Sequence, residues 1–274
     1  MMSKVAVVQM RSGRDMARNL VDATALVREA ASQGATYVLT PEVSNIFEPD
    51  KERLKSVAMT EADDIFVKGF SALARELGIH LHAGSLALNA GREKLANRSM
   101  LFGPDGELVA SYDKIHLFDI DLPGGESYRE SATYNPGEHA VTAQLPDFKL
   151  GFAICYDMRF PRLANALANA GCSVLAYPAA FTVPTGQAHW HVLLRARAIE
   201  TGSFVLAAAQ GGVHDSGRAT YGHSIVISPW GEVLVELGDD PGVLVIDIDP
   251  ASSAATRARI PALVHARDFG LKQA

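Results

Sequence analysis

Three residues that could together cleave an acyl bond each follow a predicted strand. Cys155 follows the apolar run LGFAI, Glu42 follows TYVLT and a proline, and Lys114 follows ELVASYD. In open α/β sheets, functional sites gather beyond the carboxyl ends of the strands. These positions therefore predict that a thiol, a carboxylate and an ammonium group share one site.

The chemistry that suits such a set is acyl transfer to the cysteine. A free thiol, with a pKa of about 8.5, is only a few per cent thiolate at neutral pH, so Cys155 needs a base. Glu42 could be that base if burial raises the pKa of its carboxyl towards neutrality. Lys114 and the backbone N–H of Tyr156 could then stabilise the oxyanion of a tetrahedral intermediate. Taken singly, the same residues also fit a core cysteine and two surface charges.

The histidines give weaker hypotheses. His80 and His82 lie on one face of a predicted strand, but no third ligand accompanies them, so no metal site is predicted. His189 or His191 could be the base of a cysteine–histidine enzyme, which the sequence favours less than a glutamate base. His223 falls in a predicted strand and is interpreted as a hydrogen-bonded core histidine.

Composition narrows the class of protein. The chain has 274 residues, of which 48% are hydrophobic, and a net charge of −6, so it can build a large core and lacks the basic surface of a nucleic-acid binder. Its two cysteines, Cys155 and Cys172, fit a reducing compartment, and Cys172 is predicted to lie in the core. No apolar run approaches the length of about 18 residues that a membrane span needs. We expect a cytoplasmic protein that binds neither nucleic acid nor membrane.

The order of the predicted elements repeats along the chain, and so do short stretches such as QGATYVLTP with AGCSVLAYP and GPDGELVA with SPWGEVLV. The first half is predicted to run strand 4–10, helix 17–33, strand 36–40, helix 63–77, strand 79–87 and hairpin 98–113. The second half is predicted to run strand 149–154, helix 159–170, strand 173–177, helix 187–202, strand 203–209 and hairpin 222–237, before a further strand 242–248. Internal repetition at this scale predicts two similar structural units.

The repeat predicts the fold class. Each half alternates strands and helices, which favours a mixed sheet with helices on one face. Strands such as YVLT and SVLAY lack polar alternation, which is typical of strands that are buried on both faces. We therefore predict an α/β protein in which residues 1–274 form one domain. Its expected architecture is a four-layer α-β-β-α sandwich of two mixed sheets, with an internal pseudo-twofold repeat.

Several motifs together resemble the nitrilase superfamily of carbon–nitrogen hydrolases. They are TPE at 40–42, YDKIHLFDID at 112–121, CYDMRFP at 155–161, YPAAF at 177–181, GQAHWHVLLRARAIET at 186–201 and YGHSIVISPWGE at 221–232. The resemblance covers essentially the whole chain and is strongest to the ω-amidase and deaminated glutathione amidase branch. It implies the α-β-β-α sandwich that the repeat also predicts.

The resemblance implies a role for each matching residue. Glu42 matches the general base, Lys114 the lysine that stabilises the oxyanion, and Cys155 the nucleophile. Glu130, in YRESATYNPGE, matches a second glutamate that orients the lysine and the substrate. The implied reaction is hydrolysis of a small linear carboxamide, through a thioester, to an acid and ammonia, with no metal or organic cofactor.

The loop after SVLAY, with Phe181 and Thr182, is implied to contact the substrate. Asp157 and Arg159 are expected to brace the turn of the nucleophile. Arg162 stands where the family usually has glutamate, and a cation in the first turn of a helix opposes the macrodipole. The helix expected at 159–170 commonly pairs subunits in the family, which implies a homodimer or a larger even homo-oligomer.

Other functions stay open on the sequence alone. An ω-amidase proper, a nitrilase and an N-carbamoyl amino acid hydrolase would use the same site. A non-catalytic scaffold that binds a partner is an alternative of another class, although an intact set of site residues argues against it. A redox pair of Cys155 and Cys172 is the weakest hypothesis, because the intervening helix spans about 18 Å and a disulfide needs Cα atoms within about 7 Å.

Overall fold

The computed structural model describes residues 2–91, 93–122 and 125–273, and it contains two six-stranded sheets. The first sheet has the order β16-β1-β2-β3-β4-β5, formed by Gly242–Ile248, Ser3–Gln9, Tyr37–Leu39, His80–Leu88, Ala96–Phe102 and Leu108–Asp113. The second has the order β15-β14-β11-β10-β9-β8, formed by Val233–Glu236, Ile225–Ile227, Phe204–Ala207, Val174–Ala176, Lys149–Phe152 and Thr142–Gln144.

The pairing of the strands shows the predicted internal repeat. In the first sheet β1, β2 and β3 are parallel, and β4 and β5 continue antiparallel. In the second sheet β9, β10 and β11 are parallel, and β14 and β15 continue antiparallel. Each sheet also gains one antiparallel edge strand, β16 beside β1 and β8 beside β9. The two halves therefore share one topology.

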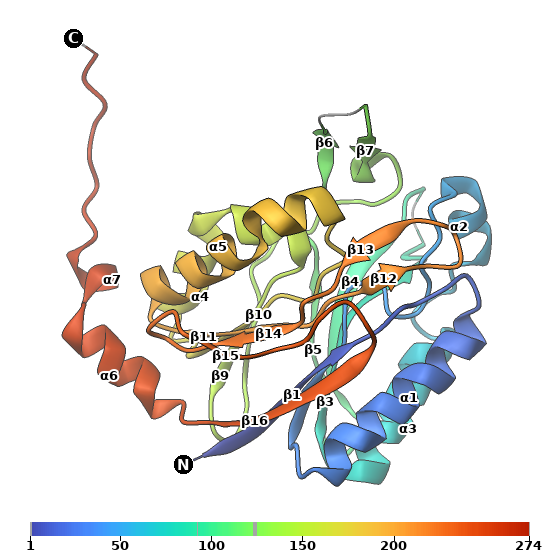
Figure 1. The fold of residues 1–274 in the computed structure, drawn as a ribbon, viewed down its shortest axis with the longest axis horizontal. Coiled ribbons are helices and arrows are strands. Elements are labelled where there is room, and N and C mark those ends of the chain that lie inside the picture. The colour runs from blue at the N-terminus through green and yellow to red at the C-terminus, as the bar shows by residue number, and fades with distance from the viewer. Residues whose placement is uncertain (1, 92, 123–124, 274) are drawn as a thin grey trace.

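The four layers follow from strands that are apolar on both faces. Val5 and Val7 of β1 belong to the core between the two sheets, whereas Ala6 and Val8 belong to the core beneath the helices of the first sheet. Successive side chains of a strand point to opposite faces, so an unbroken apolar run suits a sheet that is covered on both sides. Figure 1 shows α1 and α3 on one side of the paired sheets and α4 and α5 on the other.

Local signals set the ends of the four covering helices, which are α1 (Met16–Ser32), α3 (Ile65–Leu77), α4 (Pro161–Asn169) and α5 (Val183–Thr201). The carboxylates of Asp15 and Asp64 accept backbone N–H groups at the start of α1 and α3. Gly78 and Gly202 end α3 and α5 in the left-handed conformation, which glycine adopts without strain.

The structure corrects several predicted boundaries. The helix predicted at 187–202 begins at Val183, because Pro184 suits the first turn of a helix rather than ending the preceding loop. The helix predicted at 159–170 begins at Pro161, after a 3-10 helix over Cys155–Arg159. The sequence reading missed β8 and the short elements α2 (Lys51–Val57), β6 (Asp119–Asp121), β7 (Ser127–Arg129), β12 (Gly211–Val213), β13 (Ala219–Tyr221), α6 (Ala251–Arg259) and α7 (Ala262–His265). Within the described ranges, every helix is too short or too polar to cross a bilayer.

Candidate active site

The four residues implied to be catalytic line one cavity of about 380 Å³: Glu42, Lys114, Glu130 and Cys155. The cavity opens where strands of both sheets end. Glu42 follows β2 of the first sheet, and Cys155 follows β9 of the second. The site therefore lies across the contact between the two sheets.

A glycine allows the two sheets to approach at this point. A Cβ atom on Gly84 would lie 1.9 Å from the carbonyl oxygen of Thr40, just before Glu42, and 2.5 Å from the Cβ of Pro178. Such contacts are far inside van der Waals distance, so only glycine fits. The carbonyl of Pro178 accepts the backbone N–H of Cys155 at 2.8 Å. Gly84 thus lets β3 pack closely against the chain before Glu42 in its own sheet and against Pro178 of the other sheet.

Cys155 has an unusual backbone conformation, with φ of +47°. Residues other than glycine rarely occupy this region, and such strain persists where surrounding contacts hold the chain. The buried carboxylate of Asp157 supplies these contacts: it accepts the N–H of Ile154 at 2.8 Å and the hydroxyl of Tyr112 at 2.7 Å. Asp157 thus braces the turn, as the sequence analysis expected.

The carboxylate of Glu42 is buried and accepts three hydrogen bonds. Oε1 accepts Lys114 Nζ at 2.8 Å and Asn97 Nδ2 at 3.0 Å, and Oε2 accepts the backbone N–H of Ala180 at 2.8 Å. The side chain of Gln210 donates to the backbone carbonyl of Glu42 at 3.0 Å. These bonds fix the direction of the carboxylate.

Glu130 completes the ion pair on the other side of the lysine. Its two carboxylate oxygens accept Lys114 Nζ at 2.9 and 2.8 Å, and Oε2 also accepts the N–H of Phe118 at 2.6 Å. Asn97 Nδ2 donates to Glu130 at 3.1 Å as well as to Glu42. The lysine and the asparagine amide therefore separate two buried carboxylates that would otherwise repel each other.

The electrostatics correct one prediction. Burial raises the pKa of the Glu42 carboxyl, as the sequence analysis proposed, but the charge and hydrogen bond of Lys114 outweigh burial and the net pKa is lowered. Burial raises the pKa of the Cys155 thiol well above its usual value, and the charge of Glu42 adds to this effect. These two directions favour a resting site with a protonated thiol and an ionised carboxylate. Burial acts to lower the pKa of Lys114, but its two glutamates raise it well above normal, so the lysine is charged.

Of the three residues predicted to contact substrate, Phe181 and Thr182 line the cavity and Tyr156 does not. Phe181 and Thr182 line the cavity, Phe181 against Trp190 and Thr182 with its hydroxyl 2.8 Å from that of Thr185. The ring of Tyr156 instead packs against Phe118, with ring centroids 5.1 Å apart, and does not line the cavity. Only the backbone of Tyr156 adjoins the nucleophile.

Several residues of the site were missed by the sequence analysis. Asn97 is a buried polar side chain within β4, and the backbone N–H of Ala180 holds Glu42. Arg218 lines the cavity with its guanidinium 5.1 Å from the ring centroid of Phe47 and 4.9 Å from that of Tyr128. The strand ANRSMLF contains Asn97 beside Arg98 and Ser99, so no local signal singled out the amide, and the other two residues likewise depend on the tertiary fold.

The remaining candidates lie outside the cavity. His82 is buried, and its ring nitrogens lie 2.6 Å from the hydroxyls of Tyr37 and Ser99, so both are occupied. Burial lowers the pKa of His82 to about 3. The prediction for His223 was partly wrong, because it is hydrogen-bonded but lies outside a strand with 31% of its side chain exposed. Cys155 and Cys172 are both free thiols, and Cys172 lies in the core as predicted.

Comparison with known proteins gives a consistent result. The family model for carbon–nitrogen hydrolases matches residues 4–258. The chain is 39% identical to the mouse omega-amidase NIT2, covering 96% of this chain and 95% of that protein, and 37% identical to the deaminated glutathione amidase of Yersinia enterocolitica, covering 97% and 93%. The crystal structure of the C. elegans NitFhit protein superposes with a TM-score of 0.90 at 34% identity, covering 97% of this chain and 65% of that one. Saccharomyces cerevisiae Nit3, of the nitrilase superfamily, gives 0.85 at 31% identity, covering 95% and 94%. The predicted resemblance is confirmed, and the chain belongs to the carbon–nitrogen hydrolase family.

Proposed function

We propose that the chain is a thiol-dependent amidase that hydrolyses a small linear carboxamide to an acid and ammonia. The observation that carries this proposal is that Glu42, Lys114 and Cys155 line one cavity, in which the buried carboxylate of Glu42 accepts the Lys114 ammonium at 2.8 Å and its charge acts on the pKa of the Cys155 thiol. A base, a nucleophile and a cation in contact are the groups that acyl transfer needs.

In the first step, Glu42 takes the thiol proton while the sulfur of Cys155 attacks the amide carbon. The electrons of the C=O bond move to oxygen, and Lys114 with the backbone N–H of Tyr156 stabilises that oxyanion. Glu42 then passes the proton to the leaving nitrogen, the C–N bond breaks, and ammonia departs from a thioester. The raised pKa of the thiol makes this concerted transfer necessary, because a preformed thiolate is disfavoured.

Water then cleaves the thioester. Glu42 accepts a proton from water, the resulting hydroxide attacks the carbonyl carbon, and Lys114 again faces the oxyanion. Collapse breaks the carbon–sulfur bond, and the proton held by Glu42 returns to the sulfur. The acid leaves and the resting thiol is restored, so the cycle needs no redox partner.

The wall of the cavity supports a substrate that carries a carboxylate. Arg218 is half-buried there, and its Nε atom is buried with no hydrogen-bond partner among the residues that the structure describes. A buried guanidinium nitrogen that lacks a partner is costly, and a carboxylate would satisfy it. Together with the relatives' names, this arrangement favours deaminated glutathione or a dicarboxylic acid monoamide.

Ammonia release by the purified protein tests the proposal. The panel would hold deaminated glutathione, α-ketoglutaramate, succinamate, an N-carbamoyl amino acid and a simple nitrile, each also run with Cys155→Ala. We expect release from one of the first three and none from the variant. Release only from the carbamoyl compound or the nitrile would move the chain to those activities.

An inactive but folded protein would call for a direct test of the nucleophile. Intact mass measured during turnover should show an acyl adduct on the wild-type chain and none on Cys155→Ala. Absence of both adduct and ammonia across the panel would contradict the amidase and favour the partner-binding scaffold.

We also propose that the protein is a cytoplasmic homodimer or larger even assembly that pairs through α4. Light scattering coupled to size exclusion would give the molar mass in solution. A monomeric mass at micromolar concentration would contradict the pairing.

A further inference from the structure

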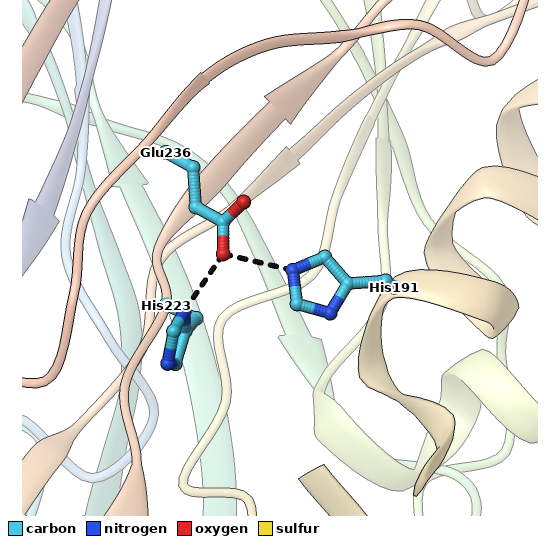
Figure 2. A group of neighbouring side chains, drawn as sticks. All are labelled: His191, His223 and Glu236. Carbon is cyan, nitrogen blue, oxygen red and sulfur yellow. Dashed lines mark hydrogen bonds and ion pairs between the residues drawn. The ribbon is translucent and has the colours of Figure 1, made fainter. Parts of the chain in front are cut away.

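A second cluster of chemically active side chains lies apart from the cavity. His191 comes from α5, His223 from the connection between β13 and β14, and Glu236 from the end of β15 (Figure 2). One ligand atom from each lies within 4.8 Å of the other two. Among the residues that line the cavity none belongs to this cluster, so it has no part in the proposed amide chemistry.

A single oxygen organises the cluster. Glu236 Oε1 lies 2.8 Å from His191 Nε2 and 2.7 Å from His223 Nδ1, and Figure 2 shows both rings directed at that oxygen. A metal cation bound here would meet two imidazole nitrogens and one carboxylate oxygen, which is a common ligand set for zinc, while each neutral ring carries its proton on the nitrogen that faces away from the ion.

The spacing needs only a small change to admit a cation. Zinc–nitrogen and zinc–oxygen bonds are about 2.0–2.2 Å long, which places ligand atoms of a tetrahedral site about 3.3–3.5 Å apart. The three side chains are 27–35% exposed, so the ring nitrogens have room to move away from Glu236 Oε1 and to adjust their own separation, which is within 4.8 Å, towards that spacing. The same exposure leaves a fourth position open to water.

The backbone holds His223 in place for such a role. Its φ is +58°, its N–H donates to the carbonyl of Gly238 at 2.8 Å, and its carbonyl accepts Trp190 Nε1 at 2.9 Å. The ring stacks on Tyr221 with centroids 4.3 Å apart. A strained residue that is fixed by bonds on both sides and by its ring is typical of preorganised sites.

We propose that His191, His223 and Glu236 bind one divalent transition-metal cation of the zinc class. The ion ties α5 to the connection after β13 and to the end of β15. Arg218 and Thr220 belong to or adjoin β13, and Thr220 forms a β-bridge with Thr182 of the cavity wall. The bound ion therefore stabilises the segment that forms this wall, without entering the reaction.

Metal titration of the Cys155→Ala protein tests this site, since that substitution removes the catalytic thiol as a competing ligand. After treatment with chelator, calorimetry with Zn²⁺ should give one equivalent bound per chain, and Zn²⁺ should raise the melting temperature. Co²⁺ should give the visible bands of nitrogen and oxygen coordination without a sulfur charge-transfer band. No binding of either ion would overturn the proposal.

Single substitutions assign the ligands. His191→Ala, His223→Asn and Glu236→Gln should each weaken binding about tenfold or more, and asparagine suits the positive φ of residue 223. His189→Ala is the matched control, an exposed histidine two positions away on the same helix, and it should bind as the parent does. Binding that survives all three ligand substitutions, or that falls equally in the control, would overturn the site. Glu236→Gln preserves side-chain shape, which keeps the test valid if a histidine variant fails to fold.

Discussion

The ammonium nitrogen of Lys114 lies 2.8 Å from Oε1 of Glu42, and both side chains are buried. This ion pair lowers the pKa of the Glu42 carboxyl, which burial alone would raise. Removing one member of a buried pair leaves an uncompensated charge, which is strongly destabilising. Loss of either member of this ion pair should therefore lower both the stability of the protein and its activity.

Substitution should distinguish the roles of Glu42 and Glu130. Glu42→Gln removes the proton acceptor and should lower kcat by about 10²–10⁴-fold. Glu130→Gln keeps an oxygen that can accept the N–H of Phe118 and should lower kcat less, because Glu130 acts through Lys114. Steady-state kinetics with both variants measures the difference. Equal losses would show that Glu42 is not the sole base.

The pH profile of kcat/KM should follow Glu42 rather than a thiolate. Because the pKa of Glu42 is lowered, activity should rise on the acid side below the ordinary glutamate value of 4.5 and then stay level through neutrality. Because the pKa of Cys155 is raised well above the ordinary value of 9.0, its alkylation by iodoacetamide should show no increase near pH 8.5. An alkylation step at that pH would contradict the protonated resting thiol.

Glu42 also links stability to pH. Its folded-state pKa is lowered, so its ionised form stabilises the fold above the ordinary glutamate range, and this contribution is lost as the pH falls. Denaturant titrations from pH 5 down to pH 3, across and below the ordinary glutamate value of 4.5, should therefore show a falling free energy of unfolding. Glu42→Gln should flatten the slope, and an unchanged slope would contradict the linkage.

Asn97 should influence the pKa of Glu42 without taking part in the reaction. Asn97→Asp places a third carboxylate beside Glu42 and Glu130, and like charges raise carboxyl pKa values. The acid limb of the kcat/KM profile should move to higher pH in this variant. Asn97→Ala removes the hydrogen bonds without adding charge and is the matched control for that shift.

Gly84 should be intolerant of a single methyl group. Gly84→Ala drives a Cβ into the carbonyl of Thr40 and should cost about 1–3 kcal/mol or more in free energy of unfolding. A Cβ on Gly238 has open space, so Gly238→Ala should change stability little. Urea denaturation of the two variants gives the comparison, and equal stability would show that the backbone around Thr40 can shift to admit a methyl group.

Arg162 should weaken α4 slightly. It is exposed in the first turn of the helix, where a positive charge opposes the macrodipole. Arg162→Glu should raise the free energy of unfolding by about 0.3–1 kcal/mol, and Arg162→Gln should give a smaller gain. Thermal melts at low and high salt measure this, since screening should shrink the difference.

The sequence predicted the fold well because buried strands and helix stops leave strong local signals. The alternation of elements in both halves and the run 242–248 needed no tertiary information. The strands at 142–144 and 219–221 were missed because TAQ and ATY lack the apolar run that marked the equally short strands YVL and VLA.

The site was predictable only in part. Strand ends pointed to Glu42, Lys114 and Cys155, whereas the role of Glu130 came from family resemblance alone. The net direction of the Glu42 pKa depends on a lysine 72 positions away, which no local pattern reports. Asn97 reaches Glu42 from β4 of the same sheet, whereas the N–H of Ala180 reaches it only because the two sheets meet.

The proposed base, Glu42, belongs to one sheet, and the proposed nucleophile, Cys155, belongs to the other. Activity should therefore depend on how closely the two halves of the repeat pack together. Either half alone would carry an incomplete set of reactive groups. A small displacement of one sheet relative to the other would abolish activity while most of the secondary structure stayed intact. On heating, loss of activity should therefore precede loss of the spectroscopic signal of the helices. An ancestral protein with a single repeat would have needed to pair with a second copy to gain this chemistry.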